Sequence, residues 1–335
     1  TIEINDDIRS LTSVVCHSLS DVPDIIDTWN EGKVVDIEGY YENAKINRVY
    51  VDRVHVKKAF AEYTAAYNAD DPKIKLKIDH TYRVAALCER IAKAAGMCAY
   101  DVELAWLSGM LHDVGRFEQI KRYNTFSDAD SVDHAKFGAD LLFKDGLIST
   151  FLKGMVKCTG YKPGALENRY SSDGVFLYDR LNKSDMEMLE LAIRCHNMYR
   201  IPQGLNRREQ AFCNVLRDAD KVDIFKVNID TPLEEIYNTT TEELMKSDIT
   251  DEVLEAFDEE HCILKAIRRT PADTVIGHVS LAYELVYDES VRITVEQGYL
   301  AKLMHFHSDN EETNRKMAMV REKMDSYVKK RIGEN

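Results

Sequence analysis

The sequence predicts an all-α protein, and three observations support this fold class. Prolines and glycines are few, at 6 and 15 in 335 residues. Most segments repeat apolar residues every three or four positions, which is the period of an amphipathic helix and not of a strand. Hydrophobic residues make up 44% and charged residues 30%, a balance typical of a globular protein with an apolar core.

The pattern divides the chain into three segments. Residues 1–52 are a short N-terminal lead of mixed structure, in which two runs rich in β-branched residues are candidate short strands. Residues 53–230 predict a dense helical bundle, interrupted at 158–183 by a long loop rich in turn-forming residues. Residues 231–335 predict an acidic helical extension that packs on the bundle.

Charge and cysteine content limit the partners and the compartment. The net charge of −14 repels the phosphates of long nucleic acids, so an anionic substrate needs a local basic pocket. The acidic first residues and the lack of any apolar run of ~18 residues argue against a signal peptide and a membrane span. Seven scattered cysteines without a CxxC pair indicate a reducing compartment. We therefore expect a cytoplasmic protein without membrane contact, and a homo-oligomer is compatible with this composition.

Two consecutive predicted helices carry the first polar side chains on apolar faces. "KIDHTYRVAALCERIAKAAG" predicts a helix that Gly96 ends, with His80 on its apolar face. A lone histidine at such a position is more often a core residue than a ligand. "YDVELAWLSGMLHDVG" predicts a helix capped by Asp101 that finishes on His112 and Asp113. A buried carboxylate such as Asp113 needs a cation or strong donors.

Three further helices repeat this pattern. "SVDHAKFGADLLFKDG" predicts a helix from Ser131 to Gly146 with His134 on its apolar face. "SDMEMLELAIRCHNMYR" predicts a helix that opens with a capping box and whose apolar face ends in His196. "EQAFCNVLRDADKVDIF" places Asp220 on the apolar face of the last helix, while Asp218 and Asp223 occupy other positions around it.

Four histidines and two carboxylates thus project from the apolar sides of five helices. One core cannot hold these groups without shared neutralisation, which two divalent cations bridged by a carboxylate would supply. Imidazole and carboxylate ligands without thiolate favour iron or manganese, with magnesium, cobalt or nickel as further candidates, and argue against structural zinc. The candidate metal ligands are His80, His112, Asp113, His134, His196 and Asp220.

The order of these residues resembles the HD-domain superfamily of metal-dependent phosphohydrolases. The resemblance covers residues 75–230 and is carried by "DHTYRVAAL", "GMLHDVGRF" and "LRDADKVD". It implies an HD-domain helical bundle in which His80, His112, Asp113 and Asp220 form the core metal set, with Asp113 bridging where two metals bind. Asp220 is chosen over Asp218 because the family ligand directly precedes the basic residue of "DADK".

His134 and His196 resemble the two extra histidines of the binuclear branches. These branches include the HD-GYP cyclic-dinucleotide phosphodiesterases, the dinucleoside tetraphosphate hydrolases and the mixed-valent diiron oxygenases. "HNMYRIPQG" begins at His196, where the GYP signature would stand, which argues against cyclic-di-GMP as the substrate.

Basic residues near the His–Asp pair are the candidates for substrate contacts. Arg116 stands where several mononucleotidase relatives have a catalytic glutamate, and it matches the basic residue of "HDIGK"-type sites, which faces phosphate. A guanidinium suits phosphate because it binds two oxygens at once. Asp113, Arg116 and Lys221 are therefore the candidate catalytic residues, and Arg116, Lys221 and Arg83 the candidate substrate-binding residues.

The resemblance implies a metal-dependent phosphoric ester hydrolase with a small phosphorylated substrate, such as a nucleotide. Two metals would lower the pKa of a bridging water, orient it and offset developing negative charge. One alternative is a mixed-valent diiron oxygenase acting on a small polar or phosphonate substrate. Another is an HD scaffold that binds a ligand without catalysis.

Overall fold

The structure is a computed structural model that describes residues 51–68, 70–152, 183–237 and 239–333. The N-terminal lead up to residue 50 and the turn-rich loop up to residue 182 lie outside these residues. The first candidate strand lies in the lead, while the second runs to residue 54 and its last two residues, Arg53 and Val54, begin a helix. Within the described residues every regular element is a helix, which confirms the expected all-α fold. None of the described helices combines the length and the apolar character that crossing a membrane requires.

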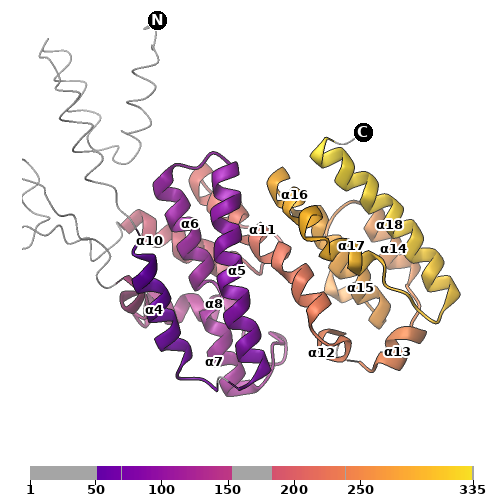
Figure 1. Ribbon diagram of the computed structural model, residues 1–335, viewed down its shortest axis with the longest axis horizontal. Coiled ribbons are helices and arrows are strands. Elements are labelled where there is room, and N and C mark those ends of the chain that lie inside the picture. The colour runs from indigo at the N-terminus through magenta and orange to yellow at the C-terminus, as the bar shows by residue number, and fades with distance from the viewer. Residues whose placement is uncertain (1–50, 69, 153–182, 238, 334–335) are drawn as a thin grey trace, which may run out of the picture.

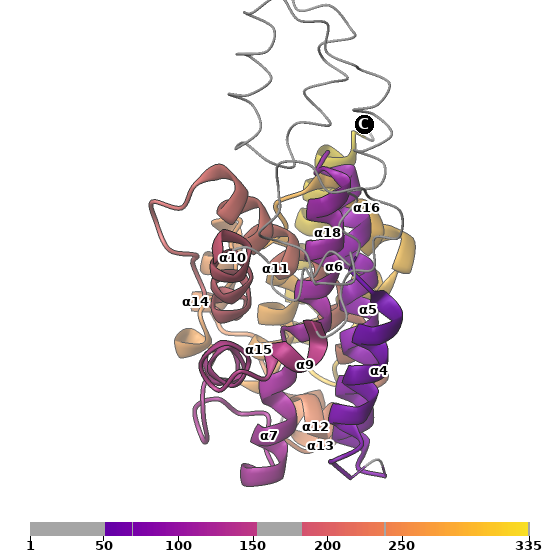
Figure 2. The same cartoon turned by 90° about the vertical axis from the view of Figure 1, so that its left-hand side faces the viewer.

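Two lobes lie side by side, and the long helix α11 runs from the first into the second (Figure 1). The helices up to the end of α11 are α4 (Arg53–Thr64), α5 (Pro72–Ala94), α6 (Ala99–Leu111), α7 (Val114–Tyr123), α8 (His134–Ala139), the π-helix η1 (Asp140–Lys144), α9 (Ile148–Leu152), α10 (Lys183–Cys195) and α11 (Arg207–Asp230). Turned by 90°, the first lobe shows α4 and α5 on one flank and α10 on the other (Figure 2).

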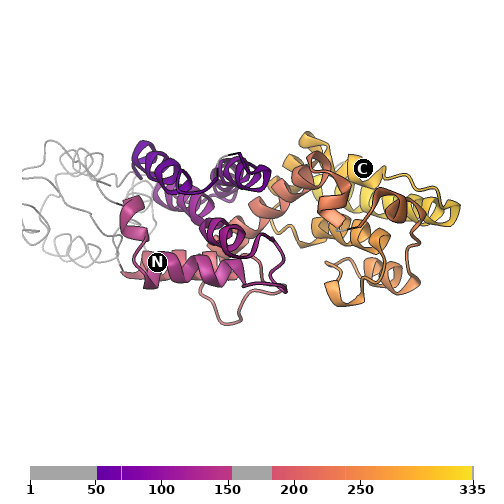
Figure 3. The same ribbon diagram turned by 90° about the horizontal axis from the view of Figure 1, so that it is seen from below.

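The second lobe consists of shorter helices around a core of its own, which begins at Phe225 in the last part of α11. These helices are α12 (Leu233–Tyr237), α13 (Thr241–Lys246), α14 (Asp251–Asp258), the 3-10 helix η3 (Lys265–Ile267), α15 (Pro271–Val279), the 3-10 helix η4 (Ser280–Glu284), α16 (Asp288–Gln297), α17 (Tyr299–Met304) and α18 (Glu311–Ile332). The view from below shows α11 entering both lobes (Figure 3).

The second lobe packs on the first through the region around α16. Leu285, Val291 and Ile293 belong to the apolar core of the first lobe. The buried carboxylate of Asp218 on α11 accepts hydrogen bonds from the backbone nitrogens of Val286 and Tyr287 and from the Ser290 hydroxyl. The division of the chain into segments 53–230 and 231–335 stays a prediction, with α11 ending at residue 230.

The second half of α6 is buried on every side, which explains why its end reaches the centre of the lobe. Its residues from Leu104 to Leu111 are all buried, as expected for a helix that is hydrophobic on every side. Gly109 lets α5 approach closely, since a Cβ atom there would lie 2.6 Å from the Cα atom of Ala85. The chain therefore leaves α6 at His112 inside the lobe and not at its surface.

Two helix starts differ from those the sequence predicted. Helix α6 begins at Ala99 with Cys98 as N-cap, so Asp101 lies in the first turn and pairs with Arg208 at 2.6 Å instead of capping. Helix α8 begins after Asp133, whose side chain accepts from the Lys136 backbone nitrogen, and not at Ser131. Aspartate and serine are both suitable N-cap residues. Asp101 does not cap because it pairs with Arg208, and Asp133 takes the capping role that was predicted for Ser131.

Two glycines allow α7 and α8 to cross closely. A Cβ atom on Gly115 would lie 2.4 Å from the His134 carbonyl oxygen and 2.7 Å from the Gly138 nitrogen. A Cβ atom on Gly138 would meet nothing closer than 3.0 Å. This crossing sets how near the start of α8 comes to the link between α6 and α7.

We predict that Gly115→Ala lowers the free energy of unfolding by about 1–3 kcal/mol, because a backbone atom cannot move away as a flexible side chain would. Gly138→Ala should cost less at the same crossing. Chemical denaturation of the two variants measures the difference, and equal stabilities would contradict the role given to Gly115.

Candidate metal centre

The structure brings the six predicted ligand residues together in the centre of the first lobe. His80 comes from α5, His112 and Asp113 from the link between α6 and α7, and Asp220 from α11. The remaining two are His134, the first residue of α8, and His196, which directly follows α10. Five of the six are no more than 4% exposed, and the Asp220 side chain is 16% exposed. Asp220 therefore marks the more open side of the cluster.

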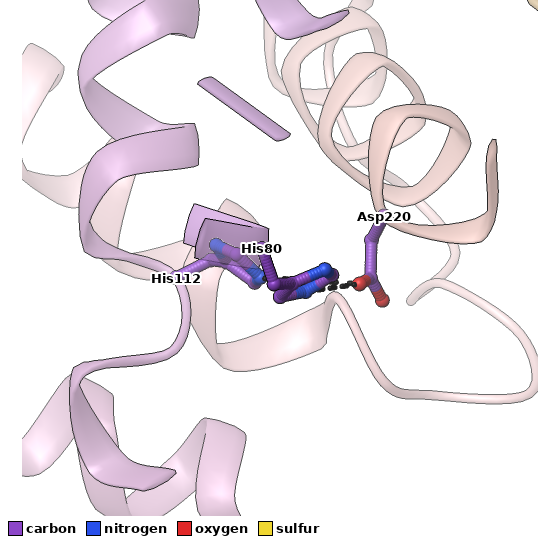
Figure 4. Close-up of side chains that lie close together, drawn as sticks. All are labelled: His80, His112 and Asp220. Atoms are coloured by element: carbon purple, nitrogen blue, oxygen red, sulfur yellow. Dashed lines mark hydrogen bonds and ion pairs between the residues drawn. The ribbon is translucent and has the colours of Figure 1, made fainter. Parts of the chain in front are cut away.

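One half of the cluster gathers around His80 (Figure 4). Its Nε2 atom lies 3.2 Å from Asp220 Oδ1 and 3.2 Å from His112 Nε2. The Nε2 atoms of His80 and His112 each lie 3.5 Å from Asp113 Oδ2. His80, His112 and Asp220 offer ligand atoms close enough together to hold a single ion.

The other half lies on the opposite oxygen of Asp113. The Nε2 atoms of His134 and His196 are 3.1 Å apart. They lie 3.6 Å and 3.8 Å from Asp113 Oδ1. The two carboxylate oxygens of Asp113 thus face different pairs of histidines.

Hydrogen bonds at Nδ1 set the tautomer of all four rings. His112 and His196 donate from Nδ1 to the backbone carbonyls of Gly109 and Ile193, at 2.8 Å and 2.7 Å. His80 and His134 place Nδ1 against carboxylates, at 2.6 Å and 2.7 Å. A neutral ring that donates from Nδ1 has its lone pair on Nε2. The Nε2 atoms of the four rings converge with two carboxylates, and these residue types form a donor set compatible with divalent metal ions.

The surroundings of Asp113, His134 and His196 set charge states that favour the binding of cations. Burial, assisted by Arg116, lowers the pKa of His134 to about 4, and burial with His112 lowers the pKa of His196 to about 4, so both rings are neutral at pH 7. Burial opposes ionisation of Asp113, but Lys77 and the nearby histidines hold its pKa well below the usual range. The carboxylate thus carries its full charge at the centre of the cluster.

Two aspartates that the sequence did not single out orient the rings. Asp223 accepts from Nδ1 of His80 and also from Arg83, whose Nε and Nη2 atoms lie 2.6 Å and 2.9 Å from its oxygens. Asp128 holds His134 through the contact at Nδ1. Asp223 stands three residues after Asp220, a spacing that keeps the two near each other on a helix. Asp128 lies in the loop before α8, where no periodicity marks it.

The three predicted substrate-binding residues have different surroundings in the structure. Arg83 turns its guanidinium to Asp223, so it supports His80 and not the open side of the cluster. Lys221 is buried beside Arg217 and forms no hydrogen bond or ion pair with any described residue; burial and Arg217 lower its pKa to about 8. Arg116 does reach the cluster, with Nε 3.8 Å from Asp113 Oδ1.

The sequence reasoning also missed Lys77, which lies one turn before His80 on α5. Its ammonium nitrogen is 2.7 Å from Asp113 Oδ2. The spacing of three residues from His80 places it on the same side of the helix and would have been the signal for it.

A family model of the HD domain matches residues 78–330, from α5 into α18. Because the match covers more than half of the chain, the protein belongs to the HD domain family. No curated protein and no solved structure matches the chain. The HD domain is a fold of metal-dependent hydrolases, and the cluster around Asp113 contains the residue types that such a site requires.

We predict that Asp223→Ala weakens metal binding about 10- to 100-fold, because His80 loses the group that fixes its ring. Titration of metal-stripped protein with Mn²⁺ in a calorimeter measures this effect. Asp218→Ala is the matched control on the same helix. It should lower the free energy of unfolding by about 2–4 kcal/mol, since buried donors lose their acceptor, and leave Mn²⁺ affinity unchanged. Equal losses of affinity would contradict the assignment.

Proposed function

We propose that this protein is a phosphohydrolase that uses two divalent metal ions to cleave a phosphomonoester or phosphodiester bond in a nucleotide or a related small phosphoester. The observation that carries the proposal is the division of donors by Asp113. Its Oδ2 faces His80 and His112, with Asp220 beside His80, while its Oδ1 faces His134 and His196. A bridging carboxylate with nitrogen donors on both sides is a suitable arrangement for a pair of ions.

The proposed ligands fit iron or manganese best, because they combine imidazole and carboxylate without thiolate, and magnesium, cobalt or nickel are further candidates. When bound, such ions supply Lewis acidity and lower the pKa of a water held between them. The residues of the chain would supply the rest: Nδ1 partners fix each ring, and Asp113 fixes the distance between the two halves.

Arg116 is the proposed residue for substrate charge. Its Nη1 atom is occupied by Gln119 Oε1, the Phe126 carbonyl and Asp128 Oδ1 at 2.7, 2.7 and 3.0 Å. These contacts hold the guanidinium against the cluster. An arginine does not release its proton in proteins, so Arg116 would stabilise charge on phosphoryl oxygens and would not act as a general acid. Lys221 has no contact in the described structure that supports the same role.

A small substrate agrees with the charge of the protein. The net charge of −14 disfavours long nucleic acids, whereas the basic groups at Asp113 are local.

The six-residue set favours one second candidate, a mixed-valent diiron oxygenase, because both His134 and His196 are present. Oxygen consumption and the electron paramagnetic resonance signal of a mixed-valent iron pair would distinguish it from a hydrolase.

The direct test combines metal analysis of anaerobically purified protein with a screen for phosphate release from nucleotides, cyclic dinucleotides and other small phosphoesters. We expect close to two ions per chain and metal-dependent release from at least one class. A full metal complement with oxygen uptake and no phosphate release would reject the hydrolase in favour of the oxygenase.

We predict that Asp113→Ala abolishes turnover and lowers the metal content of both half-sites, because both lose the same carboxylate. Elemental analysis of the purified variant measures the loss. A variant that keeps two ions per chain would show that Asp113 does not bridge them.

We predict that Arg116→Ala lowers kcat by ~10²–10³-fold while the bound metal stays, as for the removal of one oxyanion donor. Arg116→Lys should recover only part of the rate, since an ammonium cannot make the two-pronged contact. Metal content is measured in the same samples because Arg116 also holds Asp128. Lys329, exposed on α18, is the control. Equal effects of Arg116→Ala and Lys329→Ala would exclude a role for Arg116 in turnover.

A further inference from the structure

We propose that Lys77 and Arg116 form the two arms of an anion clamp that selects a terminal phosphoryl or phosphonyl group with three free oxygens. This inference rests on the proposed function for the position of the substrate. It does not depend on whether hydrolysis or oxidation follows, because it concerns only how the anion is held.

Lys77 is placed to bind a ligand at the first half of the cluster. Its ammonium group can donate three hydrogen bonds, and the contact with Asp113 Oδ2 at 2.7 Å is the one hydrogen bond it makes within the described structure. The side chain is 18% exposed, whereas Asp113 is 2% exposed. Lys77 therefore reaches from solvent to the buried carboxylate, with two donors left for a ligand.

Arg116 leaves one edge of its guanidinium free at the second half. All its hydrogen bonds to described residues come from Nη1. Its Nε atom is buried and has no hydrogen-bond partner in the described part of the chain. A buried donor without a partner is costly, so a native structure that keeps one requires an explanation. The Nε and Nη2 atoms together form the edge that binds two oxygens of one phosphate.

The ring of Phe126 lies beside both arms of the clamp. The Lys77 ammonium lies 5.5 Å and the Arg116 guanidinium carbon 5.7 Å from its centroid. The Phe126 carbonyl also accepts from Arg116 Nη1. The two cations thus share one aromatic neighbour and flank the two oxygens of the same aspartate.

The number of free donors indicates the substrate class. The arginine edge suits two oxygens and the lysine a third, and a monoester or a phosphonate has three terminal oxygens whereas a diester has two. The charge of the residues around the cluster also favours a group with three free oxygens. Asp113, Asp128, Asp220 and Asp223 oppose Lys77, Arg83 and Arg116. Two divalent ions would therefore leave the loaded site with a net positive charge of about three, which favours a dianion over a monoanion.

The test uses the full chain loaded with Mn²⁺ and two probes, inorganic phosphate and dimethyl phosphate, with binding followed by calorimetry. The clamp predicts that inorganic phosphate binds at least tenfold more tightly than dimethyl phosphate. Lys77→Met should weaken phosphate binding about 10- to 100-fold, as for the loss of one charge-assisted hydrogen bond. Lys75→Met is the matched control, because Lys75 is exposed on the same helix, and should bind phosphate as the unmodified protein does.

Two results would overturn the clamp: equal affinities for the two probes, or equal phosphate affinities for Lys77→Met and Lys75→Met. Bound Mn²⁺ is quantified in each sample. If Lys77→Met loses its metal, the comparison of the two probes on the unmodified protein decides alone. Phosphate binding that depends on Lys77 without phosphate release from any ester would reject the hydrolase and leave the clamp intact.

Discussion

The structure of the first lobe depends on one buried carboxylate. Asp113 is 2% exposed and sits between two pairs of histidines, with a cation near each of its oxygens. A lone charge at that depth would be strongly unfavourable. The helices that end or pass at this point therefore deliver compensating groups. The buried second half of α6, from Leu104 to Leu111, brings the chain to Asp113.

The chemistry of the site also depends on backbone geometry. Two of the four rings are oriented by carbonyls of the last turn of the helix that carries them, Gly109 for His112 and Ile193 for His196. These acceptors exist because the last carbonyls of a helix lack partners within it. The other two rings use aspartates, one of which is shared with Arg83. Two backbone carbonyls at helix ends and two aspartates thus orient the four rings so that their Nε2 atoms point to the same centre.

The helical pattern was enough to predict the all-α fold and to choose the six residues that the structure brings together. It placed Asp220 on the apolar face of its helix, and in the structure Asp220 lies in the cluster while Asp218 bonds to the backbone before α16. It failed where the answer depended on tertiary partners. Arg83 was expected at the substrate but pairs with Asp223, and Lys77 was overlooked because a lysine near a helix start resembles a solvated surface residue. Asp128 lies in a loop, where periodicity carries no information.

The tie between Asp218 and the backbone before α16 has a consequence for the independence of the two lobes. Asp218 and Asp220 are two residues apart, so their side chains leave α11 about 200° apart around its axis. Asp218 therefore joins α11 to the second lobe on the side of the helix that faces away from the cluster. A fragment that stops after α11 would contain all six clustered residues, yet it would lack the three donors that satisfy the buried Asp218 carboxylate. The first lobe therefore depends on the second for part of its stability, because a buried carboxylate without donors is unfavourable.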